Sequence, residues 1–279
     1  MTGKTVVITG GTSGIGQVAA EALAGMGARV VLVARDPVRG EATMARLRAK
    51  GPGAAHAIHY ADLSRLSEMK RVGREIATAE ARVDVLINNA GAIFSRREVT
   101  EDGLELTFAT NHLSYFVLTQ LLRDKLVASA PARVISTASD AHRFKGAKLN
   151  FDDLQLTEGY SGFKAYGRSK LCNILFTREL ARRLEGTGVT ANCLHPGFVA
   201  TRFGDQSQGF TSRVFGFLKN FAIPPEKGAE TITYLASSEA PAKVNGAYFY
   251  KCRETEPSRE ARDDEAAGRL WRETERVAG

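Results

Sequence analysis

The sequence predicts an α/β fold, a doubly wound parallel sheet of about seven strands with helices on both faces. Short runs of β-branched and other apolar residues alternate with longer runs whose apolar residues recur at helical spacing. This alternation is typical of a parallel sheet that is covered by helices. In addition, a glycine-rich run at residues 9–16 follows the first strand-like run and opens the first helical run, an order typical of nucleotide-binding α/β proteins.

Each expected strand is a short apolar run, and the strands are 5–9, 29–34, 55–60, 83–88, 133–137, 189–194 and 247–251. Each expected helix shows apolar residues three and four positions apart, and the helices are 14–26, 38–50, 66–79, 101–129, 163–184 and 226–237. Two segments interrupt the alternation, a polar insertion at 140–162 and an aromatic-rich stretch at 202–225. We expect a C-terminal helix near 258–277, held to the body of the protein by the lone Trp271.

Composition favours one globular domain covering residues 1–279. Apolar residues make up 43% and charged residues 25% of the chain. The sequence contains no run of 18 apolar residues, so we expect no membrane-spanning helix. No signal peptide precedes the first strand, and Cys172, Cys193 and Cys252 have no metal-site spacing, so we expect reduced cysteines and a cytoplasmic location. The net charge of +7 comes from arginines dispersed among acids, which favours an anionic small molecule over nucleic acid as the partner.

The glycine-rich run has the spacing Gly10-x-x-x-Gly14-x-Gly16, which differs from the general G-x-G-x-x-G fingerprint. Glycines allow close approach of the backbone, and a helix N-terminus offers free N–H groups to a pyrophosphate. A tight turn without a ligand is the alternative, although three glycines exceed what a turn requires.

Tyr166 and Lys170 are four residues apart in a helical run and therefore share one helix face. A lysine ammonium beside a phenol favours the phenolate, so we expect Lys170 to lower the pKa of Tyr166 and to make it an acid/base group. A solvated helix face would show the same pair. His112, His142 and His195 do not have ligand spacing, and no metal site is expected.

Four ordered motifs resemble the short-chain dehydrogenase/reductase family, whose fold is Rossmann-type. They are the glycine-rich run at 9–16, Asn-Asn-Ala-Gly at 88–91, Tyr-x-x-x-Lys at 166–170 and Pro-Gly at 196–197. Asn-His-Leu at 111–113, Ala-His at 141–142 and Ser-Lys-Leu-Cys-Asn at 169–173 are similar to its retinol dehydrogenase and protochlorophyllide reductase branch. The chain departs from the family at Ala138, where a serine is usual, and it lacks the anchor that many retinol dehydrogenases carry ahead of the first strand.

The resemblance implies an oxidoreductase that interconverts a carbonyl and an alcohol with a nicotinamide cofactor. Ser139 would bind the carbonyl oxygen, Tyr166 would transfer the proton, Lys170 would bind the nicotinamide ribose, and Asn111 would hold a water linked to Lys170. The implied cofactor-binding residues are Gly10, Thr12, Ser13, Gly14, Ile15, Gly16, Arg35, Asp62, Leu63, Asn89, Ala90, Gly91, Tyr166, Lys170, Pro196, Gly197, Val199 and Thr201. A catalytically idle NADP(H)-sensing protein on the same fold is the alternative.

Arg35 favours NADP(H), with NAD(H) as the second choice. An acidic residue at the end of the second strand would bind the ribose hydroxyls of NAD, whereas an arginine suits the 2′-phosphate of NADP. Ala34 occupies the acidic position, and Asp36 could equally cap the next helix.

The stretch 202–225 is expected to be a lid over an apolar substrate pocket, which predicts a lipophilic or aromatic substrate. Its residues Val214, Phe215, Leu218 and Phe221 are spaced as one face of a short helix, although plain core packing and weak contact with a membrane surface remain open. The family often dimerises through the helices that hold Asn111 and Tyr166, and the expected state is a homodimer or a monomer.

Overall fold

The computed structural model of the protein describes residues 1–199 and 223–279. Thr201 and nearly all of the expected lid, 202–222, lie outside the described residues.

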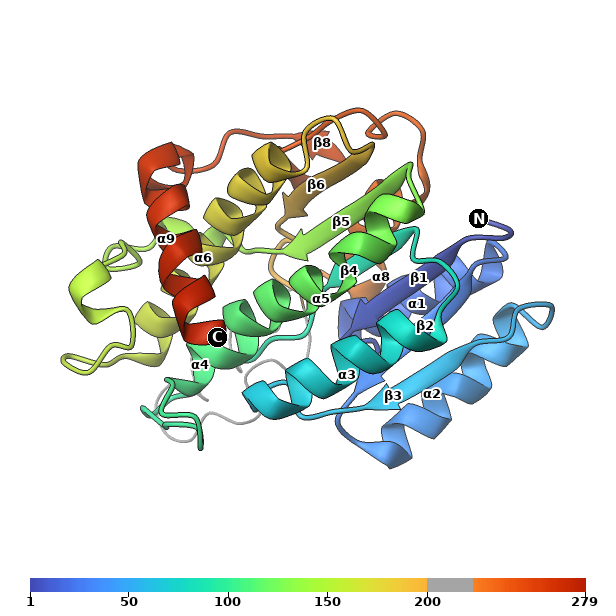
Figure 1. Ribbon diagram of the computed structural model, residues 1–279, viewed down its shortest axis with the longest axis horizontal. Coiled ribbons are helices and arrows are strands. Elements are labelled where there is room, and N and C mark those ends of the chain that lie inside the picture. The colour runs from blue at the N-terminus through green and yellow to red at the C-terminus, as the bar shows by residue number, and fades with distance from the viewer. Residues whose placement is uncertain (200–222) are drawn as a thin grey trace.

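The described strands form one sheet in the order β3-β2-β1-β4-β5-β6-β7-β8, and the ladder is parallel from β3 to β7 (Figure 1). The strands are β1 (Thr5–Thr9), β2 (Arg29–Ala34), β3 (Ala57–Tyr60), β4 (Val85–Asn88), β5 (Ala132–Thr137), β6 (Val189–Leu194), β7 (Tyr248–Tyr250) and β8 (Arg253–Glu254). The predicted fold class is confirmed. The order reverses between β1 and β4, and at such a point the carboxyl ends of the strands leave a crevice for a ligand.

The sheet has an eighth strand that the sequence did not predict. β8 pairs antiparallel with β7, with Tyr250 opposite Arg253. The two-residue turn between them places Lys251 and Cys252 in the left-handed region, with φ of 48° and 59°. Positive φ at both central residues is typical of a tight hairpin, but such turns usually carry asparagine or glycine, so Lys-Cys gives no hairpin signal.

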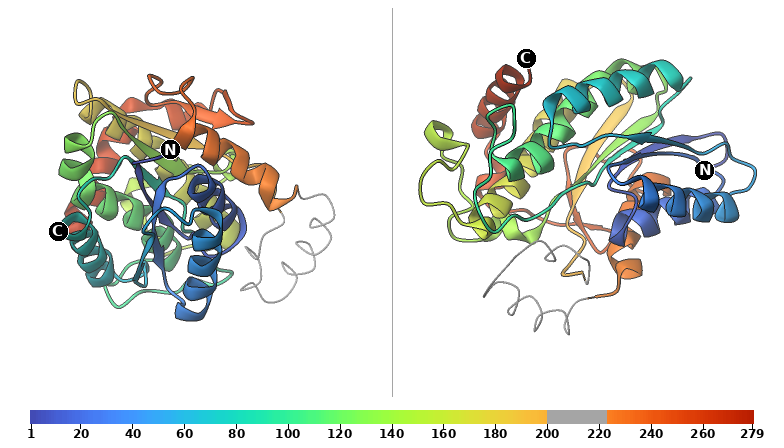
Figure 2. Two further views of the ribbon diagram at one scale, coloured as in Figure 1. Left: turned by 90° about the vertical axis from the view of Figure 1, so that its right-hand side faces the viewer. Right: turned by 90° about the horizontal axis from the view of Figure 1, so that it is seen from below.

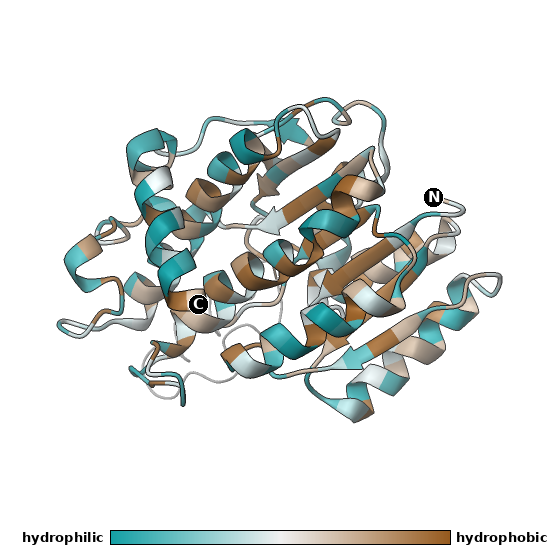
Figure 3. Ribbon diagram, in the orientation of Figure 1, coloured by the Kyte–Doolittle hydropathy of each residue, from teal (hydrophilic) through white to brown (hydrophobic). Residues whose placement is uncertain are grey.

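Helices cover both faces of the sheet, as Figure 2 shows from two further directions. One layer contains α1 (Gly14–Gly25), α2 (Pro37–Lys50) and α8 (Pro225–Ser237), and the other contains α3 (Leu66–Ala79), α5 (Ser114–Ala128), α6 (Gly162–Arg183) and α9 (Asp264–Ala278). The apolar side chains of the strands are buried between these layers, which Figure 3 shows as brown strands at the centre of the molecule. Burial on both faces explains why the strand sequences are continuous apolar runs.

The helix expected at 101–129 begins later and is not uniform. Glu105 caps its first turn, α4 (Leu106–Phe108), because its carboxylate accepts from the backbone N–H groups of Thr107 and Phe108 at 2.8 and 2.7 Å. A π-helical segment (Ala109–Leu113) then precedes α5 and contains Asn111. Such segments occur frequently at functional sites.

The C-terminal helix α9 begins at Asp264, several residues later than expected, and docks through Trp271 as predicted. The indole stacks on Phe176 of α6 with ring centroids 5.8 Å apart, and it meets Phe116 of α5 edge-on at 4.9 Å. The guanidinium of Arg183, the last residue of α6, lies 4.4 Å from the centroid of the Trp271 ring. α9 is therefore part of the core layer that holds the middle of α5 and α6 in place.

Candidate active site

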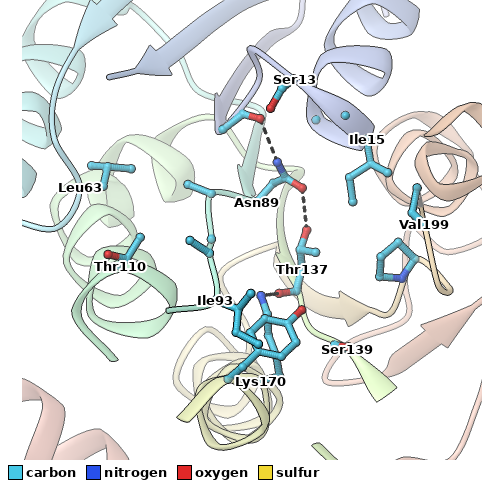
Figure 4. Close-up of a pocket in the computed structure, with 18 of the residues that line it drawn as sticks. Ser13, Ile15, Leu63, Asn89, Ile93, Thr110, Thr137, Ser139, Lys170 and Val199 are labelled. Carbon is cyan, nitrogen blue, oxygen red and sulfur yellow. Dashed lines mark hydrogen bonds between the residues drawn. The ribbon is translucent and has the colours of Figure 1, made fainter. Parts of the chain in front are cut away.

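A cavity of about 930 Å³ opens at the carboxyl ends of β1, β4 and β5, where the strand order reverses. Its wall runs from the glycine-rich turn before α1 to the tyrosine and lysine on α6 (Figure 4). Every described residue predicted to bind the cofactor lines this cavity. They are Gly10, Thr12, Ser13, Gly14, Ile15, Gly16, Arg35, Asp62, Leu63, Asn89, Ala90, Gly91, Tyr166, Lys170, Pro196, Gly197 and Val199.

The glycine-rich turn needs its glycines. A Cβ on Gly16 would lie 2.3 Å from the carbonyl oxygen of Gly10, and Gly10 itself has a φ of +65° and would bring a Cβ within 2.8 Å of the Ala90 Cα. α1 begins at Gly14, and the Ser13 hydroxyl before it makes no capping hydrogen bond. The first turn of α1 thus presents backbone N–H groups and a hydroxyl to the cavity, an arrangement that fits a pyrophosphate.

Asn89 ties together the three strand ends around this turn. Its side-chain amide donates to the carbonyl oxygens of Thr9 and Gly10 at 3.1 and 3.2 Å, and its Oδ1 accepts from the Thr137 hydroxyl at 3.2 Å (Figure 4). The backbone N–H groups of Asn89 and Ala90 both donate to the Thr9 hydroxyl at 2.9 Å. Asn89 therefore joins the ends of β1, β4 and β5.

Ser139, Tyr166 and Lys170 meet at the other end of the cavity. Ser139 follows β5 and caps a short helical turn, with its hydroxyl accepting from the Ala141 N–H at 3.2 Å. Ser139 lines the cavity together with Tyr166, and its hydroxyl acts to lower the pKa of the Tyr166 phenol. The Lys170 Nζ donates to the Thr137 carbonyl at 2.9 Å and lies 5.5 Å from the Tyr166 ring centroid. The structure therefore brings together a hydroxyl, a phenol and an amine in one wall.

The pKa values at this end of the cavity differ from the expectation that Lys170 lowers the pKa of Tyr166. Burial raises the pKa of the Tyr166 phenol, against the opposing effect of its hydrogen bond with Ser139. Burial also lowers the pKa of Lys170 to about 7, because loss of water disfavours the ammonium. The expectation considered the charge of Lys170 and not its burial, and only 2% of that residue is exposed. In the protein itself, Tyr166 is therefore held as the protonated phenol.

Asn111, the fourth predicted catalytic residue, lies behind the cavity wall and does not line it. Its side chain joins two elements: Nδ2 donates to the Ala92 carbonyl at 2.9 Å and to the Ser169 hydroxyl at 3.0 Å, while Oδ1 accepts from the Ala92 N–H at 2.8 Å. Its backbone carbonyl accepts from Asn173 Nδ2 at 2.9 Å. Asn111 thus fixes the loop after β4 against α6, and its predicted role with water stays a prediction.

Arg35 and Asp36 follow β2 and line the cavity. Asp36 caps α2 by accepting from the Arg39 N–H at 3.0 Å, and its second oxygen pairs with the Arg39 Nε at 2.9 Å. The possibility that Asp36 serves as a helix cap is confirmed. Asp62 accepts from the N–H and hydroxyl of Ser64, at 3.0 and 2.8 Å, and so holds the turn after β3 beside the cavity.

Three aromatic side chains at the mouth of the cavity were not predicted as site residues. Phe144, Phe163 and Phe198 line it and are 50%, 37% and 45% exposed. The rings of Phe144 and Phe163 meet edge-on with centroids 6.2 Å apart. Phe144 belongs to the polar insertion and Phe163 lies in the first turn of α6, so the two are brought together only by the folded insertion. In the sequence, the one sign that these two phenylalanines belong to the site is that each stands alone among polar residues.

Within residues 1–199 and 223–279, no cluster of histidine, cysteine or acidic side chains could hold a metal ion. The same ranges contain no helix that is long and apolar enough to cross a membrane.

Comparison with known proteins agrees with this geometry. The family model described as short chain dehydrogenase matches residues 4–151 and 154–209. Human retinol dehydrogenase 13 is 41% identical over 99% of this chain and 85% of its own, and mouse retinol dehydrogenase 12 is 39% identical over 96% and 84%.

Solved structures show the same fold. A protein from Mycobacterium paratuberculosis has a TM-score of 0.77 and 32% identity, covering 99% of this chain and 94% of its own. A short chain dehydrogenase from Burkholderia cenocepacia, solved in complex with NADP, has a TM-score of 0.71 and 26% identity, covering 89% and 96%. The chain therefore belongs to the short-chain dehydrogenase/reductase family, in its retinol dehydrogenase-like branch, and is an oxidoreductase that acts on CH–OH groups with a nicotinamide dinucleotide as acceptor.

Proposed function

We propose that the protein is an NADP(H)-dependent oxidoreductase that interconverts a lipophilic or aromatic carbonyl compound and its alcohol, with Tyr166 as the acid/base. One observation carries the proposal. A single cavity is lined by the glycine-rich turn at one end and by Ser139, Tyr166 and Lys170 at the other, with Lys170 Nζ 5.5 Å from the centroid of the Tyr166 ring. The bound nicotinamide would supply or accept the hydride.

The side chains supply the proton chemistry. In carbonyl reduction, the Ser139 hydroxyl donates a hydrogen bond to the substrate oxygen, and Tyr166 transfers its proton to that oxygen as negative charge develops there. Burial keeps Tyr166 protonated near neutral pH, which is the form needed for this direction. Lys170 is held by the Thr137 carbonyl at 2.9 Å, and from there its Nζ can stabilise the resulting phenolate.

The mouth of the cavity supports the substrate class. Phe144, Phe163 and Phe198 present apolar surface around the entrance, and Ile93 and Phe94 continue it inward. Exposed apolar patches of this kind usually mark a ligand or partner site. The lid assigned to 202–225 would add to the same surface, but it stays a prediction.

A panel of carbonyl compounds tests the substrate class. With NADPH present, we expect aromatic and long-chain aldehydes or ketones to give a kcat/KM at least about tenfold above that of small polar carbonyls of similar reactivity, because several buried methylenes or a ring contribute well over 1.4 kcal/mol. Loss of nicotinamide absorbance gives the rate. Equal kcat/KM across the panel would exclude a lipophilic pocket, and NADPH binding without turnover of any compound would favour the idle sensor.

The preference for NADP(H) follows from the surroundings of Arg35. Arg35 is exposed at the cavity edge, where its guanidinium can reach a 2′-phosphate. Asp36, the one acid next to it, has both oxygens engaged with Arg39 and its backbone, so it is not oriented to accept ribose hydroxyls. The solved structure of the NADP-bound relative from Burkholderia cenocepacia is consistent with this preference.

Replacing Arg35 by alanine should weaken NADPH binding by roughly tenfold or more and leave NADH binding within about twofold. A charge-assisted contact with a phosphate contributes about 1.5–3 kcal/mol. Fluorescence titration of both cofactors measures the effect. Arg46→Ala, an exposed arginine on α2 outside the cavity, is the matched control and should leave both affinities unchanged. Equal affinity of the wild type for NADH and NADPH would reject the assignment.

Three further expectations stay predictions. They are a single domain over residues 1–279, a cytoplasmic location, and a homodimeric or monomeric state. In support of a reducing compartment, Cys172, Cys193 and Cys252 are free thiols.

A further inference from the structure

The C-terminal helix is connected to the catalytic lysine by a continuous set of buried hydrogen bonds. Thr274 of α9 lies 3.0 Å from His112 Nε2, and His112 Nδ1 lies 3.3 Å from Asn173 Oδ1. Asn173 Nδ2 reaches the carbonyl oxygens of Asn111 and Thr137 at 2.9 and 3.3 Å. The Thr137 carbonyl is also the acceptor for Lys170 Nζ. We call Thr274, His112, Asn173 and the Thr137 carbonyl the C-terminal hydrogen-bond chain.

The direction of each hydrogen bond in this chain is determined by its chemistry. Both carbonyl partners of Asn173 can only accept, so its amide nitrogen must face them and its Oδ1 must face His112. His112 Nδ1 must then carry the proton that is donated to Asn173. His112 is completely buried and neutral, so its Nε2 holds a lone pair and accepts from the Thr274 hydroxyl. Every buried donor and acceptor in the chain is satisfied in only one tautomer of His112.

The C-terminal hydrogen-bond chain is shielded from water, and its side chains have little freedom to rearrange. Thr274, His112 and Asn173 are at most 1% exposed, and the Trp271 stack on Phe176 fixes α9 one turn before Thr274. Leaving one buried partner unsatisfied costs about 1–3 kcal/mol, so removal of the terminal donor favours rearrangement of the groups behind it. Those groups end at the carbonyl that orients Lys170.

We propose that Thr274, His112 and Asn173 are positioning residues that hold the Thr137 carbonyl, and through it Lys170 Nζ, in its place beside the Tyr166 ring. The inference rests on the proposed function, because it assigns Lys170 to catalysis. None of the three touches the cavity, so their effect on the reaction passes through Lys170. The C-terminal helix is thus a part of the catalytic apparatus that lies far from Lys170 in sequence.

Two measurements test the proposal. The first uses the free enzyme: NMR of the protein labelled with ¹⁵N-histidine should show His112 as the Nδ1–H tautomer at pH 7, with the signal assigned by its loss in His112→Asn. The second compares kinetics. Thr274→Val keeps the shape and removes the donor, and we expect kcat to fall roughly tenfold while KM for the carbonyl substrate changes by less than about twofold. Thr274→Ser restores the hydroxyl and should return kcat to within about twofold of wild type.

Thr231→Val on α8 is the matched control. Thr231 is as buried as Thr274 and also loses a hydrogen bond, from the Cys252 N–H at 3.1 Å, but it does not contact the C-terminal hydrogen-bond chain. It should lower the melting temperature and leave kcat unchanged. An Nε2–H tautomer of His112 in the wild type, or a wild-type kcat in Thr274→Val, would overturn the proposal, and the tautomer decides it even if that variant does not fold. A Tyr166→Phe variant that stays active would instead reject the proposed function.

Discussion

Replacing Tyr166 by phenylalanine is expected to lower kcat by about 10²–10⁴-fold and to leave the affinity for NADPH nearly unchanged. The range is that of a general acid–base group, since phenylalanine keeps the ring and removes the proton. In the wild type the ring lies 5.5 Å from Lys170 Nζ, and the phenylalanine ring should keep that place. Steady-state rates and a cofactor titration on the same preparation measure the two quantities.

The matched control is Tyr60→Phe, which removes a phenol hydroxyl that is bonded to Glu41 away from the cavity. It should keep the wild-type kcat. If Tyr166→Phe retained more than about a tenth of the wild-type kcat, Tyr166 would not be the acid/base.

Acid should destabilise the protein through His112. Burial lowers the pKa of His112 to about 4 in the folded protein, against 6.5 in the unfolded chain. Below pH 6.5 the unfolded chain therefore binds a proton that the folded protein does not, and the stability due to the neutral imidazole, present above that pH, is lost as the pH falls toward 4. The difference of about 2.5 units corresponds to roughly 3 kcal/mol of unfolding free energy.

The effect is isolated by comparing the wild type with His112→Asn, which places an uncharged donor near the position of Nδ1. Urea unfolding at pH 7 and at pH 4 should show the stability advantage of the wild type over the variant shrinking by about 3 kcal/mol. His56, His142 and His195 also have pKa values lowered by burial, and their contributions cancel in the difference. A difference that is independent of pH would contradict the buried neutral state of His112.

The sheet and the residues that line the cavity could be predicted because their signals are local. A parallel strand that is buried on both faces is a continuous apolar run, so seven strands were located to within two residues. Gly10 and Gly16 could be recognised because close backbone approach leaves no room for a Cβ there, and Gly14 because its φ of 53° favours glycine. Their grouping with Ser139, which comes after β5, follows from strand order, since carboxyl ends of parallel strands share one edge.

What the sequence could not show depends on contacts between distant segments. The π-helical segment around Asn111 leaves the spacing of apolar residues almost unchanged, so the sequence predicts one continuous helix over 101–129. The pKa shifts of Tyr166 and Lys170 depend on burial by the whole fold, which spacing along α6 does not reveal. His112 could be judged structural, but its link to Thr274 joins positions 162 residues apart.

Transfer of hydride to a carbonyl carbon is the most direct test of the proposed activity. The enzyme is incubated with NADPH that carries deuterium on the transferable position of the nicotinamide, together with an aromatic ketone or aldehyde, and the alcohol is analysed by mass spectrometry and NMR. We predict one deuterium on the former carbonyl carbon with the wild type and no labelled alcohol above background with Tyr166→Phe. Absence of labelled alcohol from the wild type with every carbonyl compound, under conditions in which NADPH binds, would contradict an oxidoreductase role for this site.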